Sequence, residues 1–253
     1  MGRIIAVVNQ KGGVGKTTTA VNLAAALHRA GRRVLLCDFD PQANATSGLG
    51  VEKSRAAHTS YDVVIGGEDA AKAVIHTDFC DLIASGAALS GAAVELVEME
   101  RREYKLKQAL APLKEQYDDI FIDCPPSLEL LTLNALCAAD SILIPVQCEY
   151  YALEGLSDLM MTLRAVKRRL NPMLEIFGVL LTMFDGRTNF SAQVAEEVRR
   201  HFPGKVFAAV IPRNVRLSEA PSHGLPVFAY DRFSRGAAAY QLLADEILKK
   251  HPN

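Results

Sequence analysis

Short, continuous apolar runs recur along this chain and limit its possible folds more than any other feature. They do not alternate polar with apolar residues, so they are typical of parallel strands buried on both faces. Segments of helical periodicity separate them, which predicts a doubly wound α/β fold: a mostly parallel sheet with helices on both faces. The expected strands are 3–8, 33–38, 81–85, 119–125, 141–146, 176–184 and 206–212. The expected helices are 17–31, 88–116, 127–138, 153–170, 191–202 and 234–250.

Length and composition favour one domain. The chain has 253 residues, of which 49% are hydrophobic, so it can bury a large core. No linker, repeat or low-complexity tract divides it. We therefore predict a single domain over residues 1–253, and we expect the weakly patterned segment 51–68 to be a surface excursion.

Charge, cysteine content and apolar runs bear on the partners of the protein and on its cellular compartment. A formal net charge of −1 neither supports nor excludes DNA, so a DNA contact requires a local patch or one created by dimerisation. The five cysteines show no C-x-x-C spacing and are typical of reduced, buried thiols. No signal peptide and no apolar run of about 18 residues is present. The sequence thus predicts a soluble, intracellular protein without a membrane span.

The segment NQKGGVGKTTT, residues 9–19, lies between the first expected strand and the first expected helix. Strand, glycine-rich loop and helix in this order predict a P-loop NTPase, in which backbone N–H groups and a lysine hold phosphates and a hydroxyl binds Mg²⁺. Gly15, Lys16 and Thr17 match this pattern, whereas Gln10 replaces its first glycine and Lys11 is an additional lysine. The alternative is a glycine-rich turn that contains a lysine by chance. The register of strand, loop, lysine, hydroxyl and helix argues against it.

Aspartates end two of the expected strands. Asp38 and Asp40 follow the second, and Asp123 ends the run FIDCPP, which has the form of a Walker B strand. A carboxylate at this edge of the sheet predicts a Mg²⁺ role for Asp123. Of Asp38 and Asp40, one is expected to serve the metal shell and the other to orient or deprotonate water. The alternative is that these aspartates only cap turns. The guanine-selecting N-K-x-D motif is absent, which favours ATP.

Several motifs together resemble the ParA/Soj chromosome-partition ATPases, which carry a deviant Walker A motif. They cover nearly the whole chain and read KGGVGKTT, DFDPQANATSGLG, FIDCPPSLELLTLNAL, PVQCEYYALEGL, LLTMFDGRTNFSAQVAEEV and IPRNVRLSEAPSHGLPV. The P-loop alone indicates only the wider superfamily, which includes MinD-like and nitrogenase-iron-protein-like members. The later motifs narrow the resemblance to the ParA branch.

The resemblance implies roles for particular residues. Lys11 is the signature lysine, which reaches the phosphates held by the other subunit of an ATP-sandwich dimer; with Lys16 and Asp40 it forms the implied catalytic set. Thr17, Asp38 and Asp123 are the implied magnesium residues, and Arg187 and Arg216 match positions implicated in DNA binding. The implied ATP-binding residues are Lys11, Gly12, Gly13, Val14, Gly15, Lys16, Thr17, Thr18, Pro212 and Asn214.

The resemblance also implies a function. ATP-bound homodimers of that family bind double-stranded DNA without sequence preference, and a ParB-type partner stimulates their slow ATP hydrolysis. We therefore expect an ATPase that uses ATP and Mg²⁺, is cytoplasmic and nucleoid-associated, and segregates chromosome or plasmid DNA. Because the sequence begins directly in the first strand, we expect no N-terminal helix-turn-helix and no operator-specific repression.

Three alternatives remain open at this point. A MinD-like membrane-associated ATPase is expected to end in a basic amphipathic helix, whereas the tail YQLLADEILKKHPN is predicted to pack on the core. An iron-sulfur reductase would bridge a cluster through cysteines; Cys124 follows the aspartate, but a second such cysteine context is missing. A ParA-like ATPase that positions a protein cargo would have the same nucleotide motifs.

Overall fold

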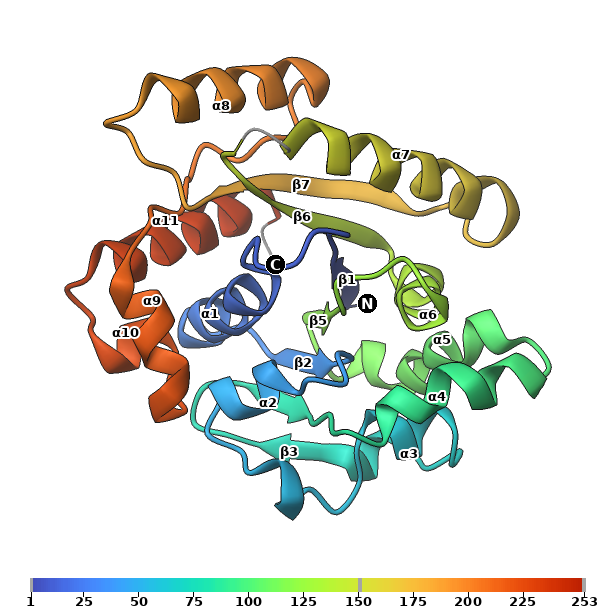
Figure 1. Cartoon of the computed structure of the whole chain (residues 1–253). Helices are drawn as coiled ribbons and strands as arrows, with labels where there is room; N and C mark the ends of the chain where they lie inside the picture. Colours follow the sequence, from blue (N-terminus) through green and yellow to red (C-terminus); the bar gives the residue numbers. More distant parts are fainter. Residues whose placement is uncertain (1, 150–151, 252–253) are drawn as a thin grey trace.

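The computed structural model describes residues 2–149 and 152–251, and a seven-stranded sheet runs through its centre (Figure 1). The strand order is β3-β4-β2-β5-β1-β6-β7, and every neighbouring pair is parallel except β3 with β4. The predicted mostly parallel sheet is therefore confirmed. The strands are β1 (Arg3–Val7), β2 (Val34–Asp38), β3 (Val74–His76), β4 (Asp81–Ile83), β5 (Asp119–Asp123), β6 (Ser141–Gln147) and β7 (Glu175–Thr182).

Helices cover both faces of the sheet, as predicted for a doubly wound fold (Figure 1). One face packs against α1 (Lys16–Arg29), α2 (Asn44–Gly48), α10 (Val227–Tyr230) and α11 (Arg235–Lys250). The other packs against α3 (Ser60–Val64), α4 (Leu89–Glu95), α5 (Lys105–Leu110), α6 (Leu130–Ala138), α7 (Ala152–Arg169) and α8 (Asn189–His201). The short helix α9 (Val215–Glu219) lies beside α10.

Successive strand residues feed two separate cores. In β1, Ile4 and Ala6 belong to the core under α4 to α8, whereas Ile5 and Val7 belong to the core under α1 and α11. All four side chains are buried. Because side chains alternate between the faces of a strand, an unbroken apolar run is what a sheet covered on both faces requires.

The expected helix 88–116 was wrong as a single helix. The structure contains α4 and α5 with short 3-10 turns beside them, and Arg101 between them has a φ of 52° in the left-handed region. That conformation ends a right-handed helix. Apolar residues spaced three and four apart are buried in each piece, for example Leu89 and Ala92 in α4 and Leu106 and Leu110 in α5. The periodicity was correct, but it belongs to two helices.

The expected strand 206–212 is also absent, although the segment runs along the outer edge of β7. Within the described residues no continuous ladder joins it to β7: the bridges are Val179 with Val206 and Phe184 with Pro212, and the amide of Ile211 donates to the carbonyl of Leu181. Between these bridges the amides of Ala208 and Ala209 donate to the carboxylate of Glu246 in α11 instead of to a strand. The carboxylate of Glu246 therefore accepts the hydrogen bonds that the carbonyl groups of β7 would accept in a regular strand pair.

The expectation for residues 51–68 was wrong in part. This segment contains α3, whose Ser60, Val63 and Val64 are buried, so it contributes to the core. All five cysteines are free and buried, as predicted. Across the described ranges, no helix is both long and apolar enough to cross a membrane. Tyr150 and Tyr151, within one of the motifs that carry the resemblance, lie outside the described residues.

Candidate nucleotide-binding site

The glycine-rich loop joins β1 to α1 at the carboxyl edge of the sheet. Gly13 and Gly15 have φ values of 74° and 89°, which only glycine adopts without strain, and α1 begins directly after Gly15. The free N–H groups at the start of this 14-residue helix therefore face the end of the loop. The local backbone thus has the form of a phosphate cradle.

Lys16 is buried at the first position of α1. The residue is 6% exposed, and its Nζ donates to the backbone carbonyl of Lys11 at 3.1 Å. Burial lowers the pKa of Lys16, and the carboxylates of Asp123 and Asp40 oppose this shift. A buried ammonium beside carboxylates, at a helix N-terminus, is suited to bind an anion between them.

Asp38 and Asp123 lie side by side because β2 and β5 pair in register at these two residues. Both are fully buried. Burial raises the pKa of Asp38 to about 6, and burial together with the nearby Asp38 raises the pKa of Asp123 well above its usual value. Neither carboxylate oxygen of Asp123 has a hydrogen-bond partner among the described residues. Two buried carboxylates, one without a partner, favour a cation between or beside them.

Asp38, unlike Asp123, is held firmly by its own chain. Its Oδ2 accepts hydrogen bonds from the backbone N–H and the hydroxyl of Thr46, both at 2.7 Å. The Thr46 hydroxyl in turn accepts from the amide of Ser85 at 2.9 Å. Sequence reasoning missed Thr46 and Ser85, since no spacing rule links a threonine on α2 to a carboxylate on β2.

Thr46→Val is expected to lower the free energy of unfolding by about 1–3 kcal/mol, because it removes a hydrogen bond to a buried carboxylate. Chemical denaturation monitored by circular dichroism measures this loss. Ser47→Ala is the matched control on the same helix: its hydroxyl donates at 3.3 Å to a carbonyl and touches no carboxylate. Equal losses for the two variants would contradict the role given to Thr46.

Asp40 lies two residues beyond β2 and is almost buried, with 6% of its surface exposed. Its Oδ1 accepts from the amide of Gln42 at 2.9 Å, and its backbone carbonyl accepts from the hydroxyl of Ser85 at 2.8 Å. The backbone of Asp40 is thus fixed on both sides. One carboxylate oxygen, Oδ1, thus holds the turn that follows β2.

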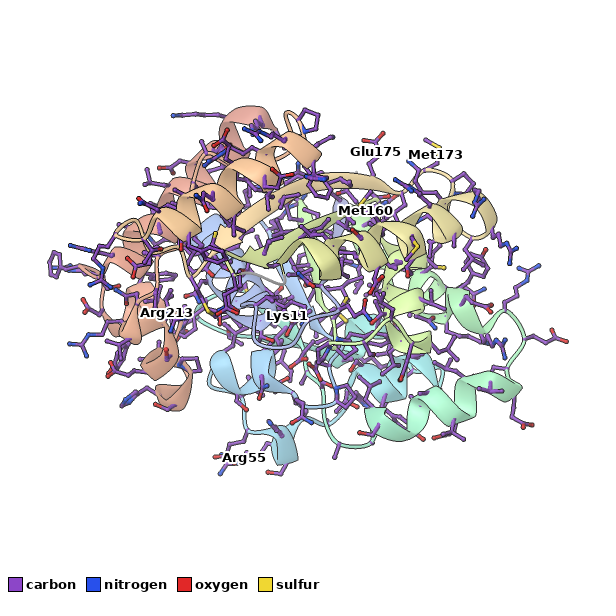
Figure 2. All side chains as sticks on the ribbon, turned by 45° about the horizontal axis from the view of Figure 1, so that its top comes forward. Lys11, Arg55, Met160, Met173, Glu175 and Arg213 are labelled. Carbon is purple, nitrogen blue, oxygen red and sulfur yellow. The ribbon has the colours of Figure 1, made fainter. Side chains whose placement is uncertain are left out.

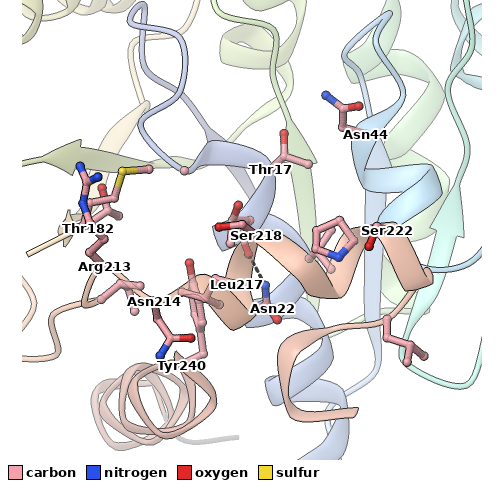
Figure 3. A pocket seen from close by; sticks show the side chains of 18 of the residues that line it. Thr17, Asn22, Asn44, Thr182, Arg213, Asn214, Leu217, Ser218, Ser222 and Tyr240 are labelled. Carbon is pink, nitrogen blue, oxygen red and sulfur yellow. Dashed lines mark hydrogen bonds between the residues drawn. The ribbon is translucent and has the colours of Figure 1, made fainter. Parts of the chain in front are cut away.

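A pocket of about 600 Å³ opens beside the loop (Figure 3). The pocket brings together five of the predicted ATP-binding residues: Gly15, Thr17, Thr18, Pro212 and Asn214. Asn214 also caps α9 by accepting from the amide of Arg216 at 3.0 Å. The other residues that line the pocket are Val21, Asn22, Asn44, Ser47, Gly48, Thr182, Met183, Ile211, Arg213, Leu217, Ser218, Pro221, Ser222, Leu225 and Tyr240.

Thr182 and Asn9 are further site residues that sequence reasoning missed. Thr182 ends β7, and its hydroxyl donates to the carbonyl of Val14 at 2.8 Å. Asn9 donates to the carbonyl of Pro145 in β6 at 2.7 Å and accepts from the amide of Lys11 at 3.0 Å. Both tie the loop to neighbouring strands. The position of a polar residue at a strand end was a usable signal for Thr182.

The predicted DNA-binding arginines are both exposed and both ion-paired. Arg187, in the loop between β7 and α8, forms a two-pronged contact with Asp185 and keeps 90% of its side chain exposed. Arg216 on α9 contacts Glu219 at 2.8 Å and Asp231 at 3.2 Å. Exposed arginines of this kind are accessible to phosphate groups, in competition with their acidic neighbours.

Comparison with solved structures shows the class to which this fold belongs. Cobyrinic acid a,c-diamide synthase from Mycobacterium smegmatis, with bound ATP analogue and magnesium, matches with a TM-score of 0.86 and 38% identity, over 98% of this chain and 95% of that chain. The septum site-determining protein MinD from Pyrococcus horikoshii OT3, complexed with Mg-ADP, matches with a TM-score of 0.82 and 30% identity, over 100% and 98%. With the glycine loop and its aspartates, this defines a P-loop ATPase fold of the MinD/ParA class.

Sequence comparison gives the family within that class. A family model described as an AAA domain matches residues 2–176. Sporulation initiation inhibitor protein Soj of Bacillus subtilis (strain 168) is 57% identical over 249 residues, 98% of this chain and 98% of that protein. Chromosome partitioning protein ParA of Myxococcus xanthus (strain DK1622) is 53% identical over 252 residues, 99% and 89%. The chain belongs to the Soj/ParA family, which confirms the resemblance.

Proposed function

We propose that this protein is a partition ATPase, which hydrolyses ATP to ADP and phosphate and segregates chromosome or plasmid DNA. The observation that carries the proposal is the convergence of a glycine loop, a buried lysine and three aspartates at one edge of the sheet. The names of the relatives and the nucleotides bound in the structural neighbours support it.

The site has a place for both the nucleotide and Mg²⁺. We assign the phosphates to the loop and Lys16, and the base to the side of the pocket lined by Pro212 and Asn214. Thr17, Asp38 and Asp123 would hold Mg²⁺, which would neutralise charge on the phosphates. The fit rests on the unpartnered carboxylate of Asp123. No three His, Cys, Asp or Glu side chains of the described ranges form a metal cluster, in keeping with a metal that takes oxygen from phosphates and water.

Hydrolysis requires an activated water and stabilisation of the transferring phosphoryl group. Asp40 is the group we assign to orient or deprotonate that water, because its carboxylate lies at the same strand ends with a fixed backbone. Lys11 of one subunit would reach the phosphates bound by the other and act as an arginine finger does in other NTPases. ATP would then be both the substrate and the ligand that joins the two subunits.

In this proposal the ATP-bound dimer binds DNA without sequence preference at the nucleoid, and a ParB-type partner stimulates hydrolysis and release. Lysine and arginine contacts to phosphates are sufficient for such binding. The tail does not favour the MinD-like membrane alternative: in α11, Leu243 and Ile247 are buried, and only Leu242 among its leucines and isoleucines is strongly exposed. The apolar face of this helix packs on the core.

The test uses the Asp40→Ala variant, in which hydrolysis should not consume the ATP. DNA binding to unrelated duplexes is measured with ATP, with ADP and without nucleotide, at low and moderate salt, together with the mass by light scattering. We expect a dimer that binds DNA only with ATP and weakens steeply as salt rises. An ATP dimer that ignores DNA would overturn the DNA-partition reading and favour a protein-cargo ATPase.

Arg187→Ala and Arg216→Ala are each expected to weaken DNA binding alike on all sequences. Each lowers the slope of log affinity against log salt by about 1, because one phosphate contact is lost. A salt titration of binding to two unrelated duplexes measures both effects. Arg200→Ala is the matched control, since Arg200 is likewise exposed and paired with the acidic residues Glu196 and Glu197. An unchanged slope in either variant would remove that arginine from the interface.

A further inference from the structure

The side chain of Lys11 contacts its own chain, not the pocket. Its Nζ lies 3.3 Å from Oε2 of Glu149, and Lys11 is not among the described residues that line the pocket. Figure 2 labels Lys11 near the middle of the molecule, with Arg213 to its left. The lysine that we assign to the partner's ATP therefore has a carboxylate partner in cis.

The carboxylate of Glu149 has two further contacts, a hydrogen bond and a longer ion pair. Its Oε1 accepts a hydrogen bond from the side-chain amide of Gln147, the last residue of β6. The guanidinium of Arg213, at the rim of the nucleotide pocket, lies 3.9 Å from the same oxygen. The carboxylate of Glu149 is thus fixed through Oε1 by one hydrogen bond from a strand end, with a guanidinium nearby, and its Oε2 contacts Lys11.

The backbone of Lys11 is fixed, so only its side chain is free to change partner. The amide of Lys11 donates to Asn9 at 3.0 Å, and its carbonyl accepts from Lys16 at 3.1 Å. Asn9 is in turn bonded to the carbonyl of Pro145 in β6. Moving the ammonium from Glu149 to a second site therefore requires rotation about side-chain bonds and no movement of the loop.

The ion pair is of a kind that exchanges readily. The side chains of Lys11 and Glu149 are 34% and 46% exposed, so water screens their attraction and replaces it at small cost. A triphosphate carries several negative charges against the single charge of the carboxylate. It should therefore outcompete Glu149 once a second subunit brings it within reach.

We propose that Glu149 is a positioning residue that holds Lys11 in cis until an ATP-loaded partner subunit offers its phosphates. The contact competes with dimerisation and suppresses dimers that lack a nucleotide. This inference rests on the proposed function, in which Lys11 acts on the ATP of the other subunit. A symmetric dimer must break the contact twice, once in each subunit.

The test compares Glu149→Gln with its parent, both in the Asp40→Ala background with ATP and Mg²⁺. Sedimentation equilibrium should give a dimer dissociation constant about 2- to 30-fold lower for Glu149→Gln, the gain expected from releasing two exposed ion pairs. The difference should shrink as salt rises, since salt screens the pair. Binding of a fluorescent ATP analogue to the monomer, at protein concentrations below dimerisation, should stay unchanged.

Glu52→Gln is the matched control, because Glu52 also pairs with an exposed cation, Arg55, but lies away from Lys11. It should leave the dissociation constant unchanged. A Glu149→Gln dimer equal to or weaker than the parent would overturn the inference and leave the proposed function standing. Absence of ATP-dependent dimers in the parent would overturn the proposed function and this inference with it.

Discussion

Lys16→Ala is expected to weaken ATP binding at least about 100-fold, since several charge-assisted contacts of the phosphates depend on this one ammonium. The side chain is almost buried at the start of α1 and lies close to Asp123 and Asp40, so no other lysine can take its place without rebuilding the loop. Isothermal titration with ATP and Mg²⁺ measures the loss directly.

The result has to be separated from unfolding, because the variant leaves buried carboxylates without their nearest cation. Circular dichroism and the denaturation midpoint of Lys16→Ala are therefore recorded with the titration. Lys53→Ala is the control for removal of a lysine: Lys53 is exposed and its Nζ contacts only the carbonyl of Gln42. A folded Lys16→Ala protein that binds ATP as the parent does would remove the P-loop assignment.

Asp40→Ala is expected to reduce the rate of ATP hydrolysis by about 100- to 10,000-fold, the range typical for loss of a general base. ATP binding should remain, because the role given to Asp40 concerns the attacking water and not the phosphates, and the ATP-bound dimer should accumulate. Single-turnover hydrolysis in the presence of DNA and a ParB-type partner measures the rate. Light scattering measures the dimer.

The matched control is Asp78→Ala, which removes an exposed aspartate from the connection between β3 and β4 and should hydrolyse ATP at the parent rate. Removal of the Asp40 carboxylate also frees the amide of Gln42, so a small loss of stability accompanies the variant. Normal hydrolysis by a folded Asp40→Ala protein, or a protein that stays monomeric with ATP, would contradict the role given to Asp40.

The sheet was predictable from the sequence because its strands are buried on both faces, which leaves an unmistakable apolar run at β1, β2, β5, β6 and β7. The antiparallel strand β3 was not predicted, since two of its three residues are only partly buried, His76 is exposed, and they carry no such run. Short helices such as α9 are set by caps and tertiary contacts, here by Asn214, and leave little periodicity in five residues. The pattern of apolar residues therefore predicts a strand or helix only where the element is long enough and continuously buried.

Part of the candidate site could likewise be predicted from the sequence, and part could not. The glycine loop, Lys16 and the aspartates that end β2 and β5 follow from residue type and order, so the sequence located them. The partners of these groups do not: Thr46 reaches Asp38, and Glu149 reaches Lys11 across 138 positions of sequence. Such contacts depend on how strands and loops come together in space, and no one-dimensional spacing encodes them.

The outer edge of β7 has a consequence for how two copies of this chain can meet. The segment 205–213 takes up its exposed hydrogen-bonding groups: Phe207 donates to Val179, and Ile211 donates to Leu181. At Gly178 the ring of Phe207 occupies the space where a side chain would stand, so the segment also packs closely on the face of β7. An incoming strand therefore finds the edge groups of Val179 and Leu181 already bonded, which disfavours extension of the sheet from one molecule into the next at this part of the border. In the dimer proposed above, the two copies would instead meet at the loops that follow the carboxyl ends of the strands, where the strength of association can depend on nucleotide.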